Sequence, residues 1–460
     1  MTMQFLQAIL WNTINIFLYK ILLQTHQVCL FYVISKQLFG ISGTIFSSIY
    51  LLISLTNFGF DYSLFSFYQQ YSSSKKEFQI LIKQYLGRFI ITLIIVAGCF
   101  ATHNFLVQLP IISFFTNNVP YALMPCLASI FITESLKKSL ETLAQLSFLN
   151  KSITILEIST IAAYLSIVWG LYVIRGTIDL PGIFIPMMLT SFIELMLLIK
   201  RLYQFYKILP TDNQNNQVDH APTSNIIANQ AVNYFNQVTK ALFSPNFLIL
   251  FLAYHLGMVK AGYIKLFTDI IILLYMLLNR SIGVPSGALL SRMPQRSILD
   301  QKIIKDTFLK ITNAYIQLLY ALAITIAAAL IPCVLKSSCF QPAVTISILL
   351  FILAGFIEYI VITYEKLFIT QNASRTLAMI NVGSALCLLY ALYRTAHSTS
   401  HFILLPIIMI RCTTIIIIAL VAHNRWSIFP TLTMHRKTII VSLTTSSFYL
   451  MLHVFLQYFS

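Results

Sequence analysis

Long apolar runs recur along the whole chain and are separated by short polar stretches. A helix needs about 20 apolar residues to cross the hydrocarbon core of a bilayer, so these runs predict membrane-spanning helices. The thirteen predicted spans are 5–34, 44–70, 80–108, 120–148, 153–174, 183–207, 236–258, 263–290, 306–335, 343–368, 376–394, 402–423 and 438–459. The pattern predicts an all-α polytopic membrane protein with about 12–14 transmembrane helices.

The second span contains a polar break. A turn is expected at Gly40 to Gly43, an apolar helix then runs to the segment Asn57–Asp61, and a loop rich in Ser and Lys follows. A carboxylate inside a hydrophobic helix is costly, and a broken membrane helix exposes backbone groups that usually line a cavity. Asp61 is therefore a candidate lumen residue that binds a coupling ion or pairs with a basic group. The alternative is that the span ends near Gly59 and Asp61 is interfacial.

Lys and Arg residues are unevenly shared between the two sets of loops. With the N-terminus inside, the inner loops hold eighteen of these residues and the outer loops hold five. Such a bias places the basic loops, and with them the N-terminus, in the cytoplasm. We expect a multi-pass protein of the cytoplasmic (inner) membrane.

The chain divides into two halves around one extended polar segment, Pro210–Asn225. The pattern of a Gly turn, a long span and a mid-helix break recurs after this segment, with its second break at Gly283–Gly287. Six spans before this segment and six after it, with one extra at the C-terminus, indicate a parallel duplication, typical of transporters with two lobes around a central path. The predicted parts are an N-terminal six-helix lobe (1–208), a cytoplasmic linker (209–225), a C-terminal six-helix lobe (226–424) and an additional helix (425–460).

Composition supports this class and excludes others. Hydrophobic residues make up 58% of the 460 residues and charged residues only 10%, against about 25% in soluble domains. The net charge of +16 arises from Lys and Arg scattered between apolar runs, so we expect an anionic lipid or substrate and no nucleic acid. The seven cysteines form no CxxC pair. No metal-ligand cluster, nucleotide-binding loop or nucleophile motif is present, so neither a cofactor nor catalysis is expected.

Two stretches resemble a known family. The run LFGISGTIFSSIYLLISLTNFGFDYSLFSFYQQYSSSKKEFQ looks like the first two helices of polysaccharide and O-antigen flippases of the Wzx type, and GYIKLFTDIIILLYMLLNRSIGVPSGALLSRMPQR looks like the matching part of their second lobe. These flippases belong to the multidrug/oligosaccharidyl-lipid/polysaccharide (MOP) exporter superfamily. The resemblance implies two lobes in a V around a central cavity, and a lipid-linked oligosaccharide carried outward by alternating access. The low glycine content and the thirteenth span depart from the family pattern.

Polar residues within the spans are candidates for the transport path. In the first span, Asn12 and Asn15 share one helical stripe with Tyr19 and His26, and Lys20 lies close to that stripe. Lys20 either attracts a phosphate from the lumen or reaches an interface along a tilted helix. Asn12, Asn15 and Lys20 are therefore candidate substrate-binding residues.

The eighth span contributes the second set of candidates. Lys265 and Asp269 are four residues apart and can neutralise each other, whereas Arg280 has no acidic residue within one turn. The guanidinium fork matches phosphate oxygens, so Arg280 and Lys265 are candidate ligands of a pyrophosphate. Asp269 is a candidate for ion coupling or lumen pairing. For Arg280 the alternative is a salt bridge or a position near the cytoplasmic surface.

Other charged residues in the spans fit a structural role. In the fourth span the helical spacing predicts a self-paired face, with a position lining the transport path as the alternative, and the remaining intramembrane carboxylates are available as partners for basic groups. The four residues of that face are Glu134, Lys137, Lys138 and Glu141.

The leading hypothesis is a flippase for a polyprenyl-pyrophosphate-linked glycan, driven by an H⁺ or Na⁺ gradient or by the membrane potential. Membrane enzymes of glycan assembly would be its partners. An ion-coupled multidrug or organic-cation exporter with the same fold is the alternative, and it predicts an acidic lumen. A membrane-embedded glycan-assembly enzyme is a third hypothesis, which the short outer loops disfavour.

Overall fold

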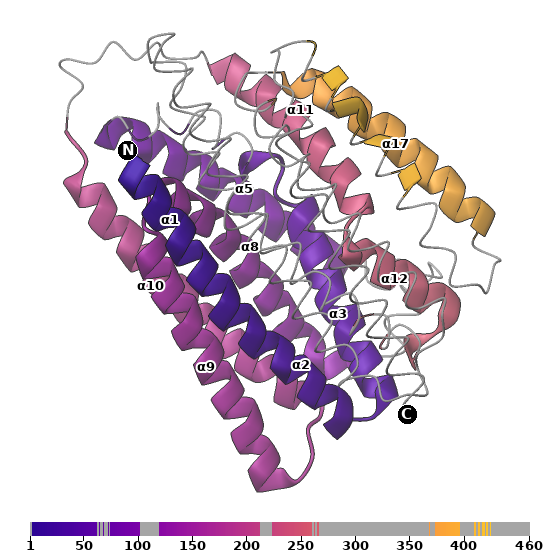
Figure 1. The fold of residues 1–460 in the computed structure, drawn as a ribbon. Coiled ribbons are helices and arrows are strands. Elements are labelled where there is room, and N and C mark those ends of the chain that lie inside the picture. Colours follow the sequence, from indigo (N-terminus) through magenta and orange to yellow (C-terminus); the bar gives the residue numbers. More distant parts are fainter. Residues whose placement is uncertain are drawn as a thin grey trace, which may run out of the picture. The chain divides into compact units, whose positions relative to one another are not determined.

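The computed structural model describes residues 2–61, 64, 68, 72, 74–101, 119–211, 223–259, 262, 265, 368, 373–395 and scattered positions between 409 and 424. Every element within these residues is a helix, which confirms the predicted all-α class (Figure 1). The chain forms two compact units, 1–267 and 268–460. Nearly all of the described helices belong to the first unit.

The first unit contains the elements that carry the candidate residues. In chain order they are α1 (Thr2–Asn15), the π-helical turn η1 (Ile16–Lys20), α2 (Ile21–Val33), α3 (Lys36–Leu55), α5 (Lys75–Ala101), the 3₁₀ turn η2 (Tyr121–Leu123), α8 (Met124–Leu146), α9 (Asn150–Arg175), α10 (Leu180–Ile208), α11 (Thr223–Leu242) and α12 (Pro245–Leu256).

Helix α3 differs at its start from the sequence-based expectation. It begins at Lys36 because Ser35 is its N-cap and accepts a hydrogen bond from the Leu38 backbone N–H at 3.2 Å. Gly40 and Gly43 lie inside the helix, so the predicted turn at these glycines is wrong. Gly40 instead permits a close contact, because a Cβ atom added there would lie 1.9 Å from the Met258 carbonyl oxygen.

The predicted break after α3 is present. The helix ends at Leu55, and the next residues form a turn in which Phe58 (φ 51°) and Gly59 (φ 73°) adopt left-handed backbone conformations. This region is favourable for glycine and uncommon for a bulky residue such as Phe58. The break therefore has a defined geometry that needs support from neighbouring helices.

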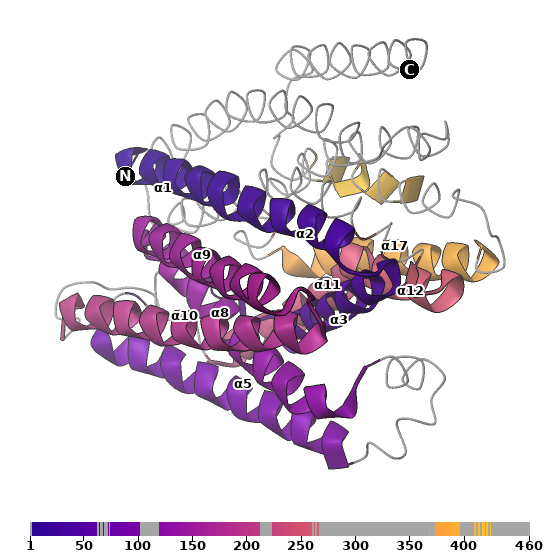
Figure 2. The same cartoon turned by 90° about the horizontal axis from the view of Figure 1, so that it is seen from below.

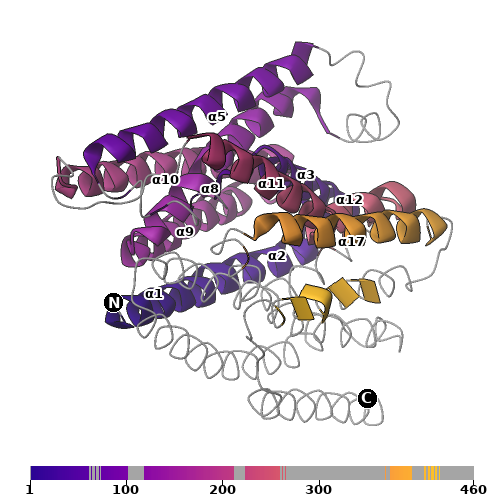
Figure 3. The same cartoon turned by 90° about the horizontal axis from the view of Figure 1, so that it is seen from above.

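Four helices form the centre of the first unit. Helix α9 lies between α1 and α10, and α8 packs against α10 (Figure 2). Helix α5 packs on the side of α8 and α10 that faces away from α1 (Figure 3). Its outward face is apolar and exposed, as at Ile90 and Ile94, where a bilayer would cover it.

Six helices in the described part of the chain are long and apolar enough to cross a membrane. They are Leu6–Val33, Lys36–Leu55, Lys75–Gly98, Asn150–Arg175, Leu180–Ile208 and Ser374–Arg394. Helix α8 is not among them because it carries four charged residues, yet it packs among spanning helices. Charged side chains in such a position face the interior of the bundle and need partners.

The seventh predicted span, 236–258, consists of parts of two helices. Helix α11 begins at Thr223, and α12 begins at Pro245 after a short turn at Phe243–Ser244. Ser244 caps α12 by accepting from the Phe247 backbone N–H at 3.2 Å, and proline is favoured in the first helical turn. Both helices pack against α3.

The second unit is described mainly by α17 (Ser374–Thr395), which corresponds to the predicted span 376–394. The Thr414 hydroxyl donates to Ser384 Oγ at 2.7 Å, so residues of the next predicted span contact this helix. The predicted spans 306–335 and 438–459 lie outside the described residues, as does nearly all of 263–290 and 343–368.

Candidate functional site: a buried charged cluster in the first helical unit

The polar stripe of the first span faces α9. Asn12 and Asn15 are buried, and the Asn15 amide donates to the Glu157 carboxylate. Further along the span, His26 Nε2 lies 3.3 Å from the Tyr164 hydroxyl. The backbone of Lys20 belongs to η1, and its side chain is outside the described part of the structure.

Asp61 lies at the break after α3. Its backbone N–H donates to Asn57 Oδ1 at 3.1 Å, and its buried Oδ1 atom has no hydrogen-bond partner. Asp61 also interacts electrostatically with Arg88 of α5. The carboxylate thus interacts at longer range with a cation that the sequence pattern did not link to it.

Arg88 connects the break to α5 and α8. Its guanidinium donates to the Thr56 carbonyl and to the Ser135 carbonyl, each at 3.3 Å, and also to Ser139 Oγ. The Thr56 carbonyl belongs to the C-terminal end of α3, where the helix dipole favours a cation. The Phe60 ring lies 5.6 Å from the guanidinium carbon. Arg88 therefore ties three helices together at the break.

Of the three candidates in the eighth span, only Lys265 lies within the described residues. Lys265 is half-buried, and its aliphatic stem lies against α3, where a Cβ added at Gly43 would be 2.9 Å from Lys265 Cγ. Asp269 and Arg280 lie outside the described residues. The predicted phosphate-binding role of Lys265 and Arg280 stays a prediction.

Lys137 is the centre of a buried ionic cluster. Its ammonium lies 2.6 Å from Glu134 Oε1 on the same helix and 3.0 Å from Glu194 Oε2 on α10. The Ser191 hydroxyl donates to Glu134 Oε1 at 2.6 Å. Lys137 and Glu194 are 8% and 5% exposed, so this is an ion-pair network inside the protein and not on its surface.

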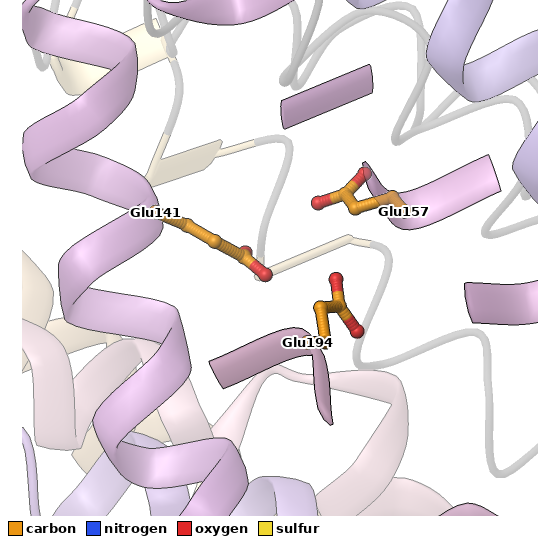
Figure 4. Close-up of side chains that lie close together, drawn as sticks. All are labelled: Glu141, Glu157 and Glu194. Atoms are coloured by element: carbon orange, nitrogen blue, oxygen red, sulfur yellow. The ribbon is translucent and has the colours of Figure 1, made fainter. Parts of the chain in front are cut away.

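Further carboxylates meet at the same place. Glu141, Glu157 and Glu194 come from three different helices, and one oxygen of each lies within 4.8 Å of the others. Figure 4 shows the three side chains pointing toward one another. Asn15 adds a buried carbonyl oxygen that accepts no hydrogen bond. We call these groups, together with Glu134 and Lys137, the glutamate cluster.

The glutamate cluster has an excess of acidic groups. The cluster contains four carboxylates and one ammonium group, and three of the carboxylates are almost fully buried. Like charges that are buried together in a medium of low dielectric constant repel one another much more strongly than in water. The arrangement is suited to sharing protons between carboxylates or to holding a cation through carboxylate and amide oxygens.

Sequence reasoning found only part of this cluster. The spacing of Glu134 and Lys137 predicted their pairing, which the structure confirms, but it gave no reason to link Lys137 with Glu194. Lys138 was expected on the same paired face and is exposed. A usable signal was present, since the fourth, fifth and sixth predicted spans each contain at least one glutamate in an apolar setting.

Comparison with known proteins identifies the fold. No family model and no curated protein sequence matches the chain. Among solved structures, an outward-facing multidrug resistance MATE family transporter of the MOP superfamily aligns with a TM-score of 0.61 and 11% identity, over 91% of this chain and 95% of that chain.

Two further structures have the same fold. A MOP superfamily transporter from Pyrococcus furiosus, described as having a binding pocket of reverse polarity, gives a TM-score of 0.58 at 10% identity over 91% of this chain and 95% of that chain. The MATE transporter ClbM in complex with Rb⁺ gives 0.56 at 11% identity over 94% and 97%. The chain therefore has the fold of the MATE transporters of the MOP superfamily, the superfamily that the resemblance of its two stretches implied.

Proposed function

We propose that this chain is a secondary transporter that moves a lipid-linked oligosaccharide across the cytoplasmic membrane by alternating access. Two independent observations support transport in general: the fold, and the row of apolar helices that enclose buried charged groups. Intramembrane charges of this kind usually belong to an ion or substrate pathway. Catalysis has no comparable support, because the similar structures are transporters.

The observation that carries the ion-coupling part of the proposal is the acidic excess of the glutamate cluster. We assign it the coupling role, in which Glu157 and Glu194 take up a proton or a monovalent cation and the Asn15 carbonyl oxygen assists. The Rb⁺ complex of ClbM supports the cation variant by analogy, since that transporter shares the fold. Uptake would neutralise the excess charge and change which helix packing is favoured.

The substrate assignment rests on the basic candidates. Lys20, Lys265 and Arg280 would hold the pyrophosphate, while the polyprenyl tail stays in the lipid. Asn12 and Asn15 were predicted as further substrate ligands, and in our proposal Asn15 acts through the glutamate cluster instead. Polarity can differ within this fold, as the description of the Pyrococcus furiosus protein indicates.

An organic-cation exporter is the second candidate. It is favoured by the same acidic excess, because carboxylates attract a cationic substrate as well as a coupling ion. The two candidates differ in the sign of the substrate charge.

Transport in proteoliposomes of the full-length chain tests the proposal. The probes are a fluorescent short-chain polyprenyl pyrophosphate carrying an oligosaccharide and the organic cation tetraphenylphosphonium. We expect the glycolipid to cross in response to a pH or Na⁺ gradient, and Arg280→Gln to abolish this without loss of protein from the membrane. Gradient-driven movement of tetraphenylphosphonium beyond its passive entry into protein-free liposomes, without movement of the glycolipid, would establish the exporter instead.

The proposed orientation can be checked separately. We place the N-terminus in the cytoplasm, with the segment 209–225 on the same side. Single cysteines at Ser72 and Thr211, in a background without native cysteines, should react with a membrane-impermeant maleimide only after the cells are opened. Labelling of both sites in intact cells would reverse the topology.

A further inference from the structure

Helix α11 presents a row of carboxamide side chains to the rest of the first unit. They recur at helical spacing, so they share one side of the helix. We call this row the amide face; its members are Asn229, Gln230, Asn233, Asn236 and Gln237. Asn233 and Asn236 are 0% exposed, and the helix contains no acidic residue. The amide face is therefore polar but uncharged.

Helix α11 packs along its amide face against the last turn of α3 and the break that follows it. Gln237 Nε2 donates to the Ser54 carbonyl at 2.7 Å. At Gly59 the two backbones nearly touch, because an added Cβ atom would lie 2.4 Å from the Gln230 carbonyl oxygen. The Phe58 and Tyr234 rings are 5.5 Å apart. The contact thus consists of backbone, amide and aromatic groups.

Hydrogen bonding across this contact is incomplete. Asn233 Oδ1 and Gln237 Oε1 are buried and accept no hydrogen bond. The amino group of Asn233 donates to Asn229 Oδ1 on its own helix and not to α3. A buried acceptor without a partner typically costs about 1–3 kcal/mol. The amide face has hydrogen-bonding capacity that its contact with α3 does not use.

We propose that the amide face binds the sugar hydroxyls of the transported glycan once α11 separates from the break after α3. A carboxamide contains both donors and an acceptor, and so does a pair of neighbouring sugar hydroxyls. The rings of Phe58 and Tyr234 would offer apolar surfaces to the C–H face of a pyranose. An organic cation would find no carboxylate on this helix.

This inference rests on the proposed function and divides the tasks between two places. The glutamate cluster takes the coupling ion, and the amide face recognises the uncharged part of the substrate. When α11 separates from α3, sugar hydroxyls can donate hydrogen bonds to the unpaired side-chain oxygens of Asn233 and Gln237. A hydroxyl-rich ligand therefore favours the open arrangement.

The test uses the purified full-length chain and three probes. They are a short-chain polyprenyl pyrophosphate that carries a neutral pentasaccharide, the same lipid without sugar, and tetraphenylphosphonium. The variant Asn233→Leu combined with Gln237→Met removes the unpaired acceptors at similar volume. The control is Phe235→Leu, an exposed position on the same helix.

We expect the double variant to bind the sugar-bearing probe about tenfold more weakly, the loss produced by removing one or two hydrogen bonds. Its affinity for the sugar-free lipid and for tetraphenylphosphonium should not change, and Phe235→Leu should match the wild type with all probes. If the double variant does not fold, Asn233→Ser carries the same expectation with a smaller loss.

Other outcomes separate the two proposals. An unchanged affinity for the sugar-bearing probe, or an equal loss with all three probes, would overturn the role of the amide face and leave the flippase intact. A wild-type protein that binds tetraphenylphosphonium but neither pyrophosphate lipid would overturn the flippase, and with it this inference.

Discussion

Two buried cations in the first unit are stabilised in opposite ways. Lys137 contacts the carboxylates of Glu134 and Glu194 within 3.0 Å, in a cluster with more acidic groups than basic ones. Arg88 donates its hydrogen bonds to uncharged carbonyl and hydroxyl oxygens, and Asp61 acts on it only at longer range.

The difference separates a functional from a structural use of buried charge. Arg88 keeps one geometry, because its donors are distributed over fixed backbone and serine oxygens at the end of α3 and on α8. The glutamate cluster contains more carboxylates than cations, and our proposed coupling role would use this excess to take up a proton or a cation. A coupling site must be able to bind and release a proton or a cation during the transport cycle.

The largest expected effect follows from removing Lys137. The substitution Lys137→Met leaves Glu134 and Glu194 without their cation, and breaking a buried ion pair typically costs about 3–5 kcal/mol. We expect a marked fall in the thermal unfolding midpoint in detergent. The matched control is Lys138→Met, which removes an exposed lysine one position away and should change little.

A second substitution sharpens this result. Adding Glu194→Gln to Lys137→Met should restore part of the lost stability, because the double variant buries one uncompensated charge fewer. Equal stability of Lys137→Met and wild type would mean that the cluster is not electrostatically coupled.

Removing Arg88 should lower stability less than removing Lys137, and it should leave ion coupling intact. Arg88→Met leaves the Thr56 carbonyl and the two serine hydroxyls without their common donor, at a cost of about 2–3 kcal/mol. Lys83→Met, an exposed substitution on the same helix, serves as control. Thermal unfolding measures the stability. An altered pH profile of transport in Arg88→Met would erase the distinction between the two cations.

Gly59→Ala tests the break that Arg88 supports. The Cβ atom of an alanine at position 59 would clash with the Gln230 carbonyl oxygen. The left-handed backbone conformation at φ 73° also destabilises an alanine there by about 1 kcal/mol. We expect a lower unfolding midpoint. Gly87→Ala is the control, because no atom lies within 4 Å of its added Cβ, and alanine favours a helix. Destabilisation by Gly87→Ala of the same size would contradict this account.

The smallest effect on stability, and the largest on coupling, is expected for the carboxylates themselves. Glu157→Gln and Glu194→Gln should each lower stability less than Lys137→Met does, because Lys137 keeps Glu134 as its partner and one buried negative charge is removed. The dependence of the transport rate on pH or Na⁺ should flatten, as measured in proteoliposomes. The control is Glu77→Gln in the first turn of α5. A gradient dependence as steep as that of the wild type would remove the cluster from the coupling role.

Much of the architecture follows from one-dimensional patterns. The apolar runs located α5, α8, α9 and α10 to within several residues, and the polar break at Asn57–Asp61 follows the end of α3. The predicted span 44–70 misses the start of α3, and 236–258 covers parts of α11 and α12. The expected turn at Gly40–Gly43 is wrong because these glycines serve close packing against Met258 and Lys265, contacts with residues more than two hundred positions away.

The site was less predictable for the same reason. Pairing of Glu134 with Lys137 is local and could be read from helical spacing, but Glu194 is 57 residues from Lys137 and meets it only through the packing of α10 on α8. Likewise, the stripe containing Asn15 could be recognised as polar, while its facing partner Glu157 depends on how α1 meets α9. Residue spacing shows which side chains share one face of a helix, whereas the packing of the helices decides which residues lie opposite that face.

The charged face of α8 has a consequence for biosynthesis. A lysine or acidic residue near the centre of a helix opposes its insertion by about 2.5–3.5 kcal/mol. Helix α8, with Glu134, Lys137, Lys138 and Glu141, should therefore not leave the translocon alone. Its partner Glu194 is synthesised 57 residues after Lys137. We expect α8, α9 and α10 to enter the bilayer as one preassembled hairpin group, with the Lys137–Glu194 ion pair formed before lipid surrounds them.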